Sequence, residues 1–397
     1  MDLLYVVNQF PKLSESFVIN ELYELDKRGH NLSVFALSQP DEQITHTEIE
    51  EMDITTYYAD NSSLSSLPNL FSKYILNPSV LRQAAFVDDP LNYAHYLHIG
   101  KQIMEFIGDR GGVDLIHAHF ATPNRLAVSY AAAYYDIPCT ITAHAHEIFA
   151  PSSIKQLRRV CSRFNHIIVP SEYNKRYLSE EIGINTDMTV VPATTSVKKF
   201  EPSNNCVPGR LLTIARLVEK KGHEYAIDAV AELNDQGYDV EYHIVGTGER
   251  KDFLRERVSE RGIEDNVKFL GHVSDEQLES ELYEAELFVL PCVIASNGDR
   301  DVAPVALKEA MATRTACLST CISAIPELIT DGHDGILVEP NNSEALTDAI
   351  SSLLDDPIRR EEIAANGRKT VETKFDISQA VDLLEATFDS IQSRGRN

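Results

Sequence analysis

The stretch RLLTIARLVEKKGHEYAIDAVAELNDQGYDVEYHIV, residues 210–245, contains one complete strand–helix–strand pattern. A short apolar run, Arg210–Arg216, is followed by an amphipathic stretch around Gly222–Gln236 and by a second apolar run, Val240–Val245. Two strands joined by a helix of this length pair in parallel, because the helix returns the chain to the end of the sheet where the first strand began. The stretch therefore predicts a parallel α/β sheet.

The same alternation of β-rich runs and helical stretches extends along the chain in both directions. Pro, Asn and Gly are concentrated in EPSNNCVPG, residues 201–209, the best candidate for an interdomain linker. We therefore predict an α/β protein with two doubly wound Rossmann-like domains facing a cleft, residues 1–200 and 210–375. A C-terminal helix, residues 376–397, is expected to pack back on the first domain. Residues 41–102 are irregular and polar, and we expect one or two helices and a loop there, without bounds that the sequence fixes.

The remaining predicted elements share the apolar, β-rich or amphipathic patterns described above. The strands are Leu3–Val7, Leu32–Leu37, Val113–His117, Cys139–Ala143, His166–Val169, Thr189–Pro192, Val267–Leu270, Leu287–Pro291, Ala316–Ser319 and Gly335–Val338. The helices are Ser16–Gly29, Asn124–Asp136, Ser171–Ile182 and a helical end from about Ser343.

The chain of 397 residues is strongly acidic, with 36 Lys and Arg against 61 Asp and Glu and a net charge of −25. This charge repels nucleic acid and anionic lipid, so neither is expected as a bulk partner. The acidic residues are spread along the chain, which argues against an acidic interaction segment. The magnitude of the charge favours adaptation to a high-salt cytoplasm, where counterions screen self-repulsion. An ordinary acidic mesophilic enzyme is the alternative.

The sequence predicts neither export nor membrane insertion. The N-terminus lacks a basic segment and runs straight into a strand, and no apolar run reaches about 18 residues. The six cysteines include no C-x-x-C pair and are expected to be reduced, mostly buried thiols. We expect a cytoplasmic protein with at most weak contact with the inner face of the cell membrane, since no basic amphipathic helix is found in the first domain.

Two glycines, Gly246 and Gly248, follow the strand that ends at Val245. A dinucleotide fingerprint needs a third glycine at the position of Lys251. We interpret the pair as a tight strand-to-helix turn and expect no nicotinamide cofactor. Walker, H-E-x-x-H and G-x-S-x-G motifs do not occur in the sequence, which excludes most generic enzyme classes.

Three cations, Arg216, Lys220 and Lys221, follow the first strand of the second domain and precede a helix. Arginine offers a fork of donors, lysine a point charge and the helix start free N–H groups, a combination that suits a diphosphate. A solvated basic loop is an equally good interpretation of these residues alone.

Two carboxylates lie near a helix that we expect to begin at Pro304. Glu309, inside this helix, can accept hydrogen bonds from the two vicinal hydroxyls of a ribose, and Asp301, just before it, can reach a sugar hydroxyl. Acidic residues near a helix N-terminus also complement the helix dipole without any ligand. That alternative is favoured when the segment is considered alone.

Histidines gather at the ends of two predicted strands of the first domain, as His117 and His119 and as His144 and His146. They can hydrogen-bond sugar hydroxyls or orient a reacting group. A metal cluster is the weaker alternative, because no carboxylate completes a known pattern. For His117 a structural role is the better interpretation.

Eight segments, taken in order, resemble the family-4 retaining glycosyltransferases of the GT-B fold, in particular the branch that builds capsule, exopolysaccharide and surface glycans. The resemblance covers nearly the whole chain, and the ordered set is far more specific than any one segment. It implies transfer of a sugar from a nucleotide-diphosphate donor to a glycan or lipid-linked saccharide, with retention at the anomeric carbon. The segments are FPKLSESF (10–17), HAHF (117–120), TAHAHEIF (142–149), ARLVEKKG (215–222), VGTGE (245–249), FLGHVS (269–274), DRDVAPVALKEAMA (299–312) and IPELITDGHDGILV (325–338).

The resemblance also implies residue roles. Arg216 and Lys221 would hold the diphosphate and stabilise the departing nucleotide, and Glu309 would bind the ribose. His144 and Asp301 would lie at the donor sugar as the catalytic pair. No metal and no cofactor is expected, because two cations can do the work of a metal ion. The remaining residues are Gly246, Gly248, Val273 and Val302 on the donor side and Ser14, Glu15, Ser16, Asn124 and Arg125 on the acceptor side.

Three positions depart from the family pattern. Asp301 replaces the first Glu of an E-x(7)-E pair, Val302 replaces the usual Gly, and Ser323-Ala324 replace glycines that often precede the IPEL segment. Each change makes the donor pocket tighter or repositions it. The alternative functions are therefore a catalytically silent GT-B binding or scaffold partner and another GT-B enzyme, such as a nucleotide-sugar 2-epimerase.

Overall fold

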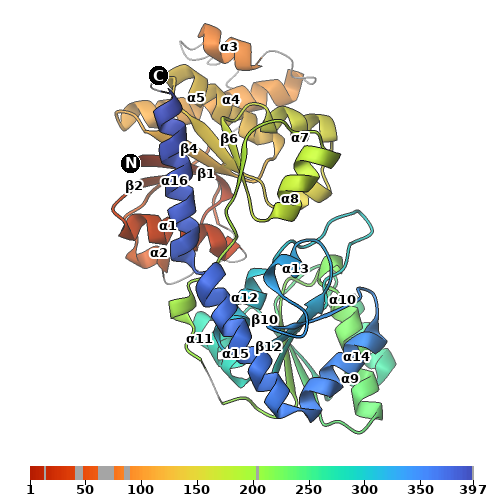
Figure 1. Ribbon diagram of the computed structural model, residues 1–397. Helices are drawn as coiled ribbons and strands as arrows, with labels where there is room; N and C mark the ends of the chain where they lie inside the picture. The colour runs from red at the N-terminus through yellow and green to blue at the C-terminus, as the bar shows by residue number, and fades with distance from the viewer. Residues whose placement is uncertain (13–14, 41–47, 61–75, 85–89, 203–204, 396–397) are drawn as a thin grey trace. The chain divides into compact units, whose positions relative to one another are not determined.

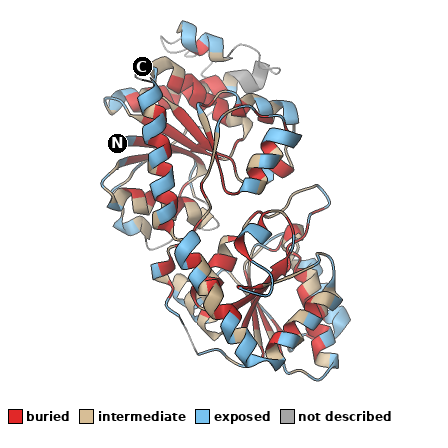
Figure 2. Cartoon of the chain, in the orientation of Figure 1, coloured by how far each residue is buried: buried red, intermediate tan, exposed pale blue. Residues whose placement is uncertain are grey.

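The computed structural model describes residues 1–12, 15–40, 48–60, 76–84, 90–202 and 205–395. They form two compact units, Met1–Pro192 with Val381–Asn397, and Ala193–Ala380. Each unit is built on one parallel sheet covered by helices (Figure 1). Most strand residues are buried, and most helices expose one side and bury the other (Figure 2). The predicted α/β fold with two Rossmann-like parts is confirmed.

The first sheet has seven parallel strands in the order β3-β2-β1-β4-β5-β6-β7. The order reverses at β1, which pairs with β2 on one side and with β4 on the other. In such sheets ligands bind beyond the carboxyl ends of the strands at the reversal. The strands are β1 Asp2–Gln9, β2 Asn31–Ser38, β3 Thr55–Tyr58, β4 Leu115–His119, β5 Cys139–Thr142, β6 His166–Val169 and β7 Met188–Val190.

Strand β4 begins and ends two residues later than the predicted Val113–His117, so His119 lies inside the strand. The segment left open by the sequence, residues 41–102, contains the short edge strand β3 and parts of three helices. Its alternating, weakly buried pattern gives no strong periodic signal. The helices of the first unit are α1 Ser16–Lys27, α2 Glu48–Glu51, α3 Pro78–Ala84, α4 Pro90–Asp109, α5 Leu126–Tyr135, α6 His146–Phe149, α7 Ile154–Cys161 and α8 Glu172–Arg176.

The second sheet has six parallel strands in the order β10-β9-β8-β11-β12-β13, with the reversal at β8. The strands are β8 Arg210–Ile214, β9 Glu241–Val245, β10 Val267–Gly271, β11 Leu287–Leu290, β12 Ala316–Thr320 and β13 Ile336–Val338. The helices are α9 His223–Asp235, α10 Lys251–Arg261, α11 Asp275–Glu284, α12 Val305–Ala312, α13 Ile325–Leu328, α14 Ser343–Asp355, α15 Pro357–Lys374 and the start of α16 Ile377–Gly395.

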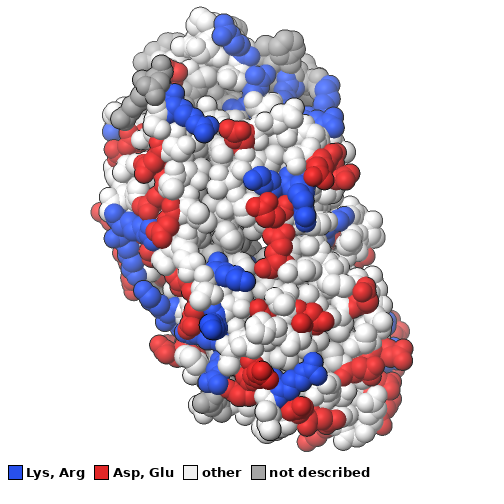
Figure 3. Space-filling view, viewed as in Figure 1, with Lys and Arg blue, Asp and Glu red and all other residues white. Residues whose placement is uncertain are grey.

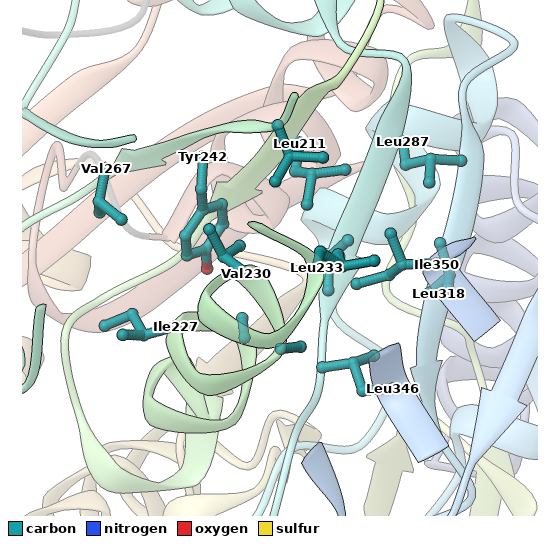
Figure 4. Close-up of a cluster of buried hydrophobic side chains, with 14 of the residues drawn as sticks. Leu211, Ile227, Val230, Leu233, Tyr242, Val267, Leu287, Leu318, Leu346 and Ile350 are labelled. Atoms are coloured by element: carbon teal, nitrogen blue, oxygen red, sulfur yellow. The ribbon is translucent and has the colours of Figure 1, made fainter. Parts of the chain in front are cut away.

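The core of the second unit explains why this half of the chain folds as one layered body. Strand residues such as Leu211, Leu287 and Leu318 pack against Leu233 of α9 and Ile350 of α14 (Figure 4). All five are at most 1% exposed. Burying a leucine or isoleucine contributes about 1.5–3 kcal/mol each, which holds α9 and α14 on this face of the sheet.

The division between the units falls at 192/193 and not within residues 201–209. The reason is that Val197 and Phe200, which precede the Pro- and Gly-rich segment, are buried in the core of the second unit. Residues 203–204 of the predicted linker lie outside the described residues.

Helix α16 belongs to the first unit from Val381 onward. Its Glu385 lies 2.6 Å from both Arg28 Nη1 and His30 Nε2, and its Phe388 ring lies 5.4 Å from the ring of His117. The C-terminal helix therefore packs on the N-terminal sheet.

The protein surface mixes acidic and basic side chains on the face shown in Figure 3. Among the described residues no helix combines the length and apolarity needed to cross a membrane. Helix α7 corrects one expectation, since it is basic and amphipathic, with Lys155 and Arg158 exposed and Leu157 and Val160 buried. A cavity of about 780 Å³ lies between α7 and residues 183–186, and none of the predicted site residues lines it.

Candidate functional site

Two loops meet at the carboxyl edge of the second sheet. One follows β8 and carries the three cations, and the other follows β11 and carries Asp299 and Asp301. Lys221 Nζ lies 2.7 Å from Asp301 Oδ2, and Lys220 Nζ lies 3.1 Å from Asp299 Oδ1. Strands β8 and β11 are neighbours at the reversal of strand order, so the sheet itself brings these distant segments together.

The Lys221–Asp301 pair is charged although it is largely buried, with the two side chains 13% and 14% exposed. Burial acts to raise the pKa of Asp301, but the charges of Lys221 and Lys220 outweigh it and lower the pKa to about 2. Burial acts to lower the pKa of Lys221, and Asp301 more than reverses this. The Cys292 thiol donates a further hydrogen bond to Asp301, over 3.4 Å. At neutral pH the site therefore presents fixed, opposite charges side by side.

Two glycines let the turn after β9 pack closely against the loop that carries the three cations. A Cβ on Gly246 would lie 2.1 Å from the carbonyl oxygen of Ala215, and one on Gly248 would lie 2.4 Å from that of Leu217. The Leu217 N–H donates to the carbonyl of Thr247 over 2.9 Å, which joins the two turns. The glycine pair thus serves the close approach of two backbones, in agreement with the tight-turn interpretation.

Arg216 has an exposed side chain at the start of this loop. Its carbonyl oxygen lies 3.1 Å from Nε2 of the buried His223. The pKa of His223 falls to about 4, mainly through burial. A neutral, buried His223 therefore holds the backbone of Arg216 through this contact, and the Arg216 side chain remains exposed to solvent.

Helix α12 begins at Val305, one residue later than expected, with Pro304 as its N-cap. Glu309 is partly exposed within this helix. Its neighbour Lys308 is fully buried and donates from Nζ to the carbonyl of Ala303 over 2.8 Å, which ties the Asp301 loop to the helix. Burial lowers the pKa of Lys308 to about 7.

The remaining predicted donor-side residues, Val302 and Val273, and the family departure Ser323 differ in burial and backbone conformation. Val302 is 6% exposed, so its side chain is packed inside the protein. Val273 is partly buried against the core. Ser323 adopts a left-handed conformation with φ 50, the region that favours glycine, and its Oγ is buried without a hydrogen-bond partner among the described residues.

His144 follows β5 in the first unit and contacts two aromatic rings. The ring centroids of Phe17 and Phe120 are 4.7 and 4.6 Å from its own. The backbone N–H of His144 donates to Glu147 Oε1 over 2.7 Å, and its backbone carbonyl accepts from Asn174 Nδ2 over 2.5 Å. Burial and the neighbouring His119 lower its pKa well below the usual value, so the imidazole is neutral at pH 7.

His144 contacts a second imidazole, since its Nε2 lies 3.0 Å from His119 Nδ1. Beyond it, Glu21, His117 and His119 place three donor atoms within 4.8 Å of one another, a set that could hold a metal ion. Both nitrogens of His117 are already engaged, however, at 2.8 Å by the hydroxyl of Thr140 and at 3.0 Å by that of Thr142. Hydrogen bonds therefore satisfy His117 without a metal, in agreement with its structural interpretation.

The structure corrects the expected role of Arg125. It was placed on the acceptor side, yet the side chain is completely buried. Its Nε donates to the carbonyl of His119 over 2.8 Å and its Nη2 to Asn8 Oδ1 over 2.9 Å. Burial lowers its pKa only to about 10, so it remains a cation at neutral pH. Arg125 joins the ends of β1 and β4 and offers no surface to a substrate.

Of the other acceptor-side residues, Glu15, Ser16 and Asn124 are partly exposed. Asn124 accepts a hydrogen bond from the Thr122 hydroxyl over 2.5 Å. Glu15 pairs with Lys12 over 3.3 Å, Ser16 is the first residue of α1, and Ser14 lies outside the described residues.

Sequence reasoning missed Glu21, Glu147 and Lys308. A signal existed for two of them, because each stands on the apolar stripe of a helix. Glu21 lies three residues after the buried Val18, and Lys308 lies next to the buried Leu307. A charged residue in such a position needs a partner, and the sequence does not say which one.

Two family models match the chain. Residues 14–195 match the one described as Glycosyltransferase Family 4, and residues 198–370 match the one described as Glycosyl transferases group 1. The chain is 26% identical over 412 aligned residues to the amylovoran biosynthesis glycosyltransferase AmsK of Erwinia amylovora, covering 97% of this chain and 99% of that protein.

Two solved structures share the fold. The crystal structure of Anabaena Alr3699/HepE in complex with UDP and glucose has a TM-score of 0.75 at 19% identity, covering 98% of this chain and 100% of that one. Sucrose-phosphate synthase from Thermosynechococcus elongatus has a TM-score of 0.75 at 16% identity, covering 99% and 100%. Both likenesses extend over the two parallel-sheet units.

Proposed function

The chain belongs to the family-4 glycosyltransferases and has their GT-B fold, and from this premise we propose that it moves a sugar from a nucleotide-diphosphate donor to a glycan or lipid-linked saccharide, with retention at the anomeric carbon. AmsK is named for the synthesis of an exopolysaccharide, and the HepE crystals hold UDP and glucose. These two relatives support a polysaccharide acceptor and a nucleotide-sugar donor.

The observation that carries the proposal is the Lys221–Asp301 pair with Arg216 beside it, at the strand reversal of the second sheet. A nucleotide diphosphate is a concentrated anion, and Arg216 and Lys221 can balance its charge. Asp301 cannot bind an anion, but it can accept hydrogen bonds from sugar hydroxyls. A site with both signs of charge fits a ligand that joins a diphosphate to a sugar.

In the proposed reaction the bond from the anomeric carbon to the diphosphate breaks and a bond to the acceptor oxygen forms on the same face. The acceptor hydroxyl passes its proton to the departing diphosphate oxygen, and the nucleotide diphosphate leaves as an anion. Arg216 and Lys221 stabilise that growing negative charge. Asp301 holds Lys221 in place before the reaction starts, and Arg216 lies at the exposed start of the same loop. They take the role that a metal ion has elsewhere, so we propose a metal-independent enzyme.

His144 is proposed to contact the donor sugar beside the reacting carbon. Its imidazole is neutral because burial disfavours the charged form. A neutral ring is suitable next to a carbon that gains positive charge in the transition state, since an imidazolium would repel it. Glu309 is proposed to bind the ribose.

Thermal shift measurements with UDP-, GDP-, ADP- and dTDP-sugars in high-salt buffer test the donor site. We expect one nucleotide series to stabilise the wild-type protein and to lose its effect in Lys221→Gln and Glu309→Gln. The exposed Lys369 on α15 supplies the control Lys369→Gln, which removes the same charge from the same unit. Its response should equal that of the wild type.

The product of the stabilising donor then tests the chemistry. Transfer to an oligosaccharide or lipid-linked saccharide with unchanged anomeric configuration supports the proposal, and Lys221→Gln should lower kcat/KM about 100- to 1000-fold. Binding without transfer or hydrolysis would favour a silent partner, and release of a 2-epimer would favour an epimerase. Absence of binding to every donor would refute the proposal.

A further inference from the structure

Four polar side chains of the first unit form a row that ends at His144. The Tyr5 hydroxyl donates to Glu21 Oε1 over 2.7 Å, and His119 Nε2 lies 3.5 Å from the same oxygen. On its other side, His119 Nδ1 lies 3.0 Å from His144 Nε2. The row combines residues of β1, α1, β4 and the segment after β5, so only the folded sheet assembles it.

His119 is the central member of the row and is 1% exposed. Its Nε2 is buried and has no hydrogen-bond partner among the described residues, and the carboxylate of Glu21, 3.5 Å away, is the acceptor beside it. A buried N–H or lone pair without a partner is unfavourable by about 1–3 kcal/mol. The carboxylate beside Nε2 therefore bears on which tautomer a neutral His119 adopts.

A carboxylate accepts hydrogen bonds and cannot donate them. The His119 proton is therefore favoured on Nε2, toward Glu21, which leaves Nδ1 as an acceptor. His144 must then donate from Nε2 to complete the 3.0 Å contact. A neutral imidazole has a single N–H, so Nδ1 of His144 remains unprotonated.

We propose that Glu21 and His119 are positioning residues that fix the tautomer of His144, so that its Nδ1 accepts a hydrogen bond from a hydroxyl of the donor sugar. This inference rests on the proposed function for the identity of the ligand. It explains why a carboxylate stands on the apolar side of α1, between the buried Ile19 and Leu22. It also gives the two histidines distinct roles: His119 fixes which ring nitrogen of His144 carries the proton, and His144 binds the sugar hydroxyl.

The tautomer can be measured directly by two-bond ¹H–¹⁵N correlation NMR on protein labelled with ¹⁵N-histidine. The two nitrogens of a neutral imidazole have very different ¹⁵N shifts, and the spectrum of His144→Asn assigns the signals of His144. We expect the wild type at pH 7.5 to carry the His144 proton on Nε2. A proton on Nδ1, as a cationic His119 would require, overturns the proposal.

Variants of Glu21 separate its acceptor role from its bulk. Glu21→Gln keeps a carbonyl oxygen, and we expect it to keep the wild-type tautomer of His144. Glu21→Met keeps the length but removes the acceptor, and we expect a mixture of both tautomers. The control is Glu24→Met on the same helix, because Glu24 pairs with Arg28 over 3.0 Å and, within the described part of the chain, makes no hydrogen bond or ion pair with His119 or His144. An unchanged tautomer in Glu21→Met would refute the role of Glu21.

The kinetic consequence is a separate measurement. If the donor is turned over, Glu21→Met should lower kcat about fivefold to tenfold, the cost of one misdirected hydrogen bond. Glu21→Gln should restore most of it, and KM for the nucleotide sugar should change less than about twofold. The NMR result does not depend on turnover. A wrong prediction of the His144 tautomer can therefore be distinguished from a wrong assignment of the proposed function. Wild-type kcat in Glu21→Met would show that the tautomer has no catalytic role.

Discussion

Lys308 is expected to make the stability of the second unit depend on pH. Its side chain is completely buried, its Nζ donates to Ala303, and the ring of Phe375 lies 5.3 Å from Nζ. Burial lowers its pKa from 10.5 to about 7, and the charge of Glu309 opposes this only in part. The folded chain then binds fewer protons than the unfolded chain between these two values. Stability therefore rises with pH across that window.

The two pKa values set the size of the effect. Relative to a side chain that never titrates, Lys308 destabilises the fold by about 5 kcal/mol at pH 6 and by about 2 kcal/mol at pH 9. Lys308→Met should therefore stabilise the unit by about 3 kcal/mol more at pH 6 than at pH 9. The substitution also removes the hydrogen bond to Ala303 and changes the packing. These changes alter the free energy of unfolding in either direction, but by an amount that does not vary with pH.

Equilibrium urea unfolding at pH 6, 7.5 and 9, followed by circular dichroism, measures this difference. Wild type, Lys308→Met and the exposed control Lys369→Met are compared, and the transition that shifts in Lys308→Met identifies the second unit. The control should differ from wild type by an amount nearly independent of pH. If the Lys308→Met difference changes by less than about 0.5 kcal/mol between pH 6 and 9, Lys308 is charged in the folded protein and the reasoning is wrong.

Four further outcomes are expected. Gly246→Ala should destabilise the protein by more than about 2 kcal/mol in thermal melts, because its Cβ would meet a carbonyl oxygen at 2.1 Å, whereas Gly262→Ala, with nothing within 4 Å, should cost about 1 kcal/mol. Arg125→Met should cost about 2–4 kcal/mol, since two buried acceptors lose their donor, and a melt within about 0.5 kcal/mol of wild type would contradict that. Ser323→Gly should stabilise by about 0.5–1 kcal/mol by relieving the left-handed φ of 50, and a lowered melting temperature would exclude the strain. Because the net charge is −25, the melting temperature should rise between low and molar KCl, and equal values would reject adaptation to high salt.

Much of the fold was predictable because its signals are local. Apolar runs such as Val240–Val245 and Leu287–Pro291 coincide with strands β9 and β11 to within a residue. The boundary between the units was not predictable in this way. The Pro- and Gly-rich segment 201–209 indicates an irregular backbone, but it does not show which core the flanking residues join. Val197 and Phe200, which precede this segment, are buried in the core of the second unit.

The candidate site was predictable in its residue types and not in its contacts. Three cations after β8 and a carboxylate before α12 are visible in the sequence, and the sheet order makes them neighbours. The same features give no warning that Arg125 is buried or that Glu21 faces His119. Exposure and partners depend on which elements pack together, which no short segment contains.

The sequence by itself determined two parallel α/β units and the side chains placed at the carboxyl ends of their strands, because periodicity, turn residues and strand–helix alternation are properties of neighbouring residues. Only the tertiary structure decided which of those side chains are paired and which are buried. Lys221 meets Asp301, and Glu21 approaches His119, across elements far apart in the chain. The lowered pKa of Asp301 and the raised pKa of Lys221 follow from their contact, which outweighs the effect of burial and arises only when the sheet is assembled.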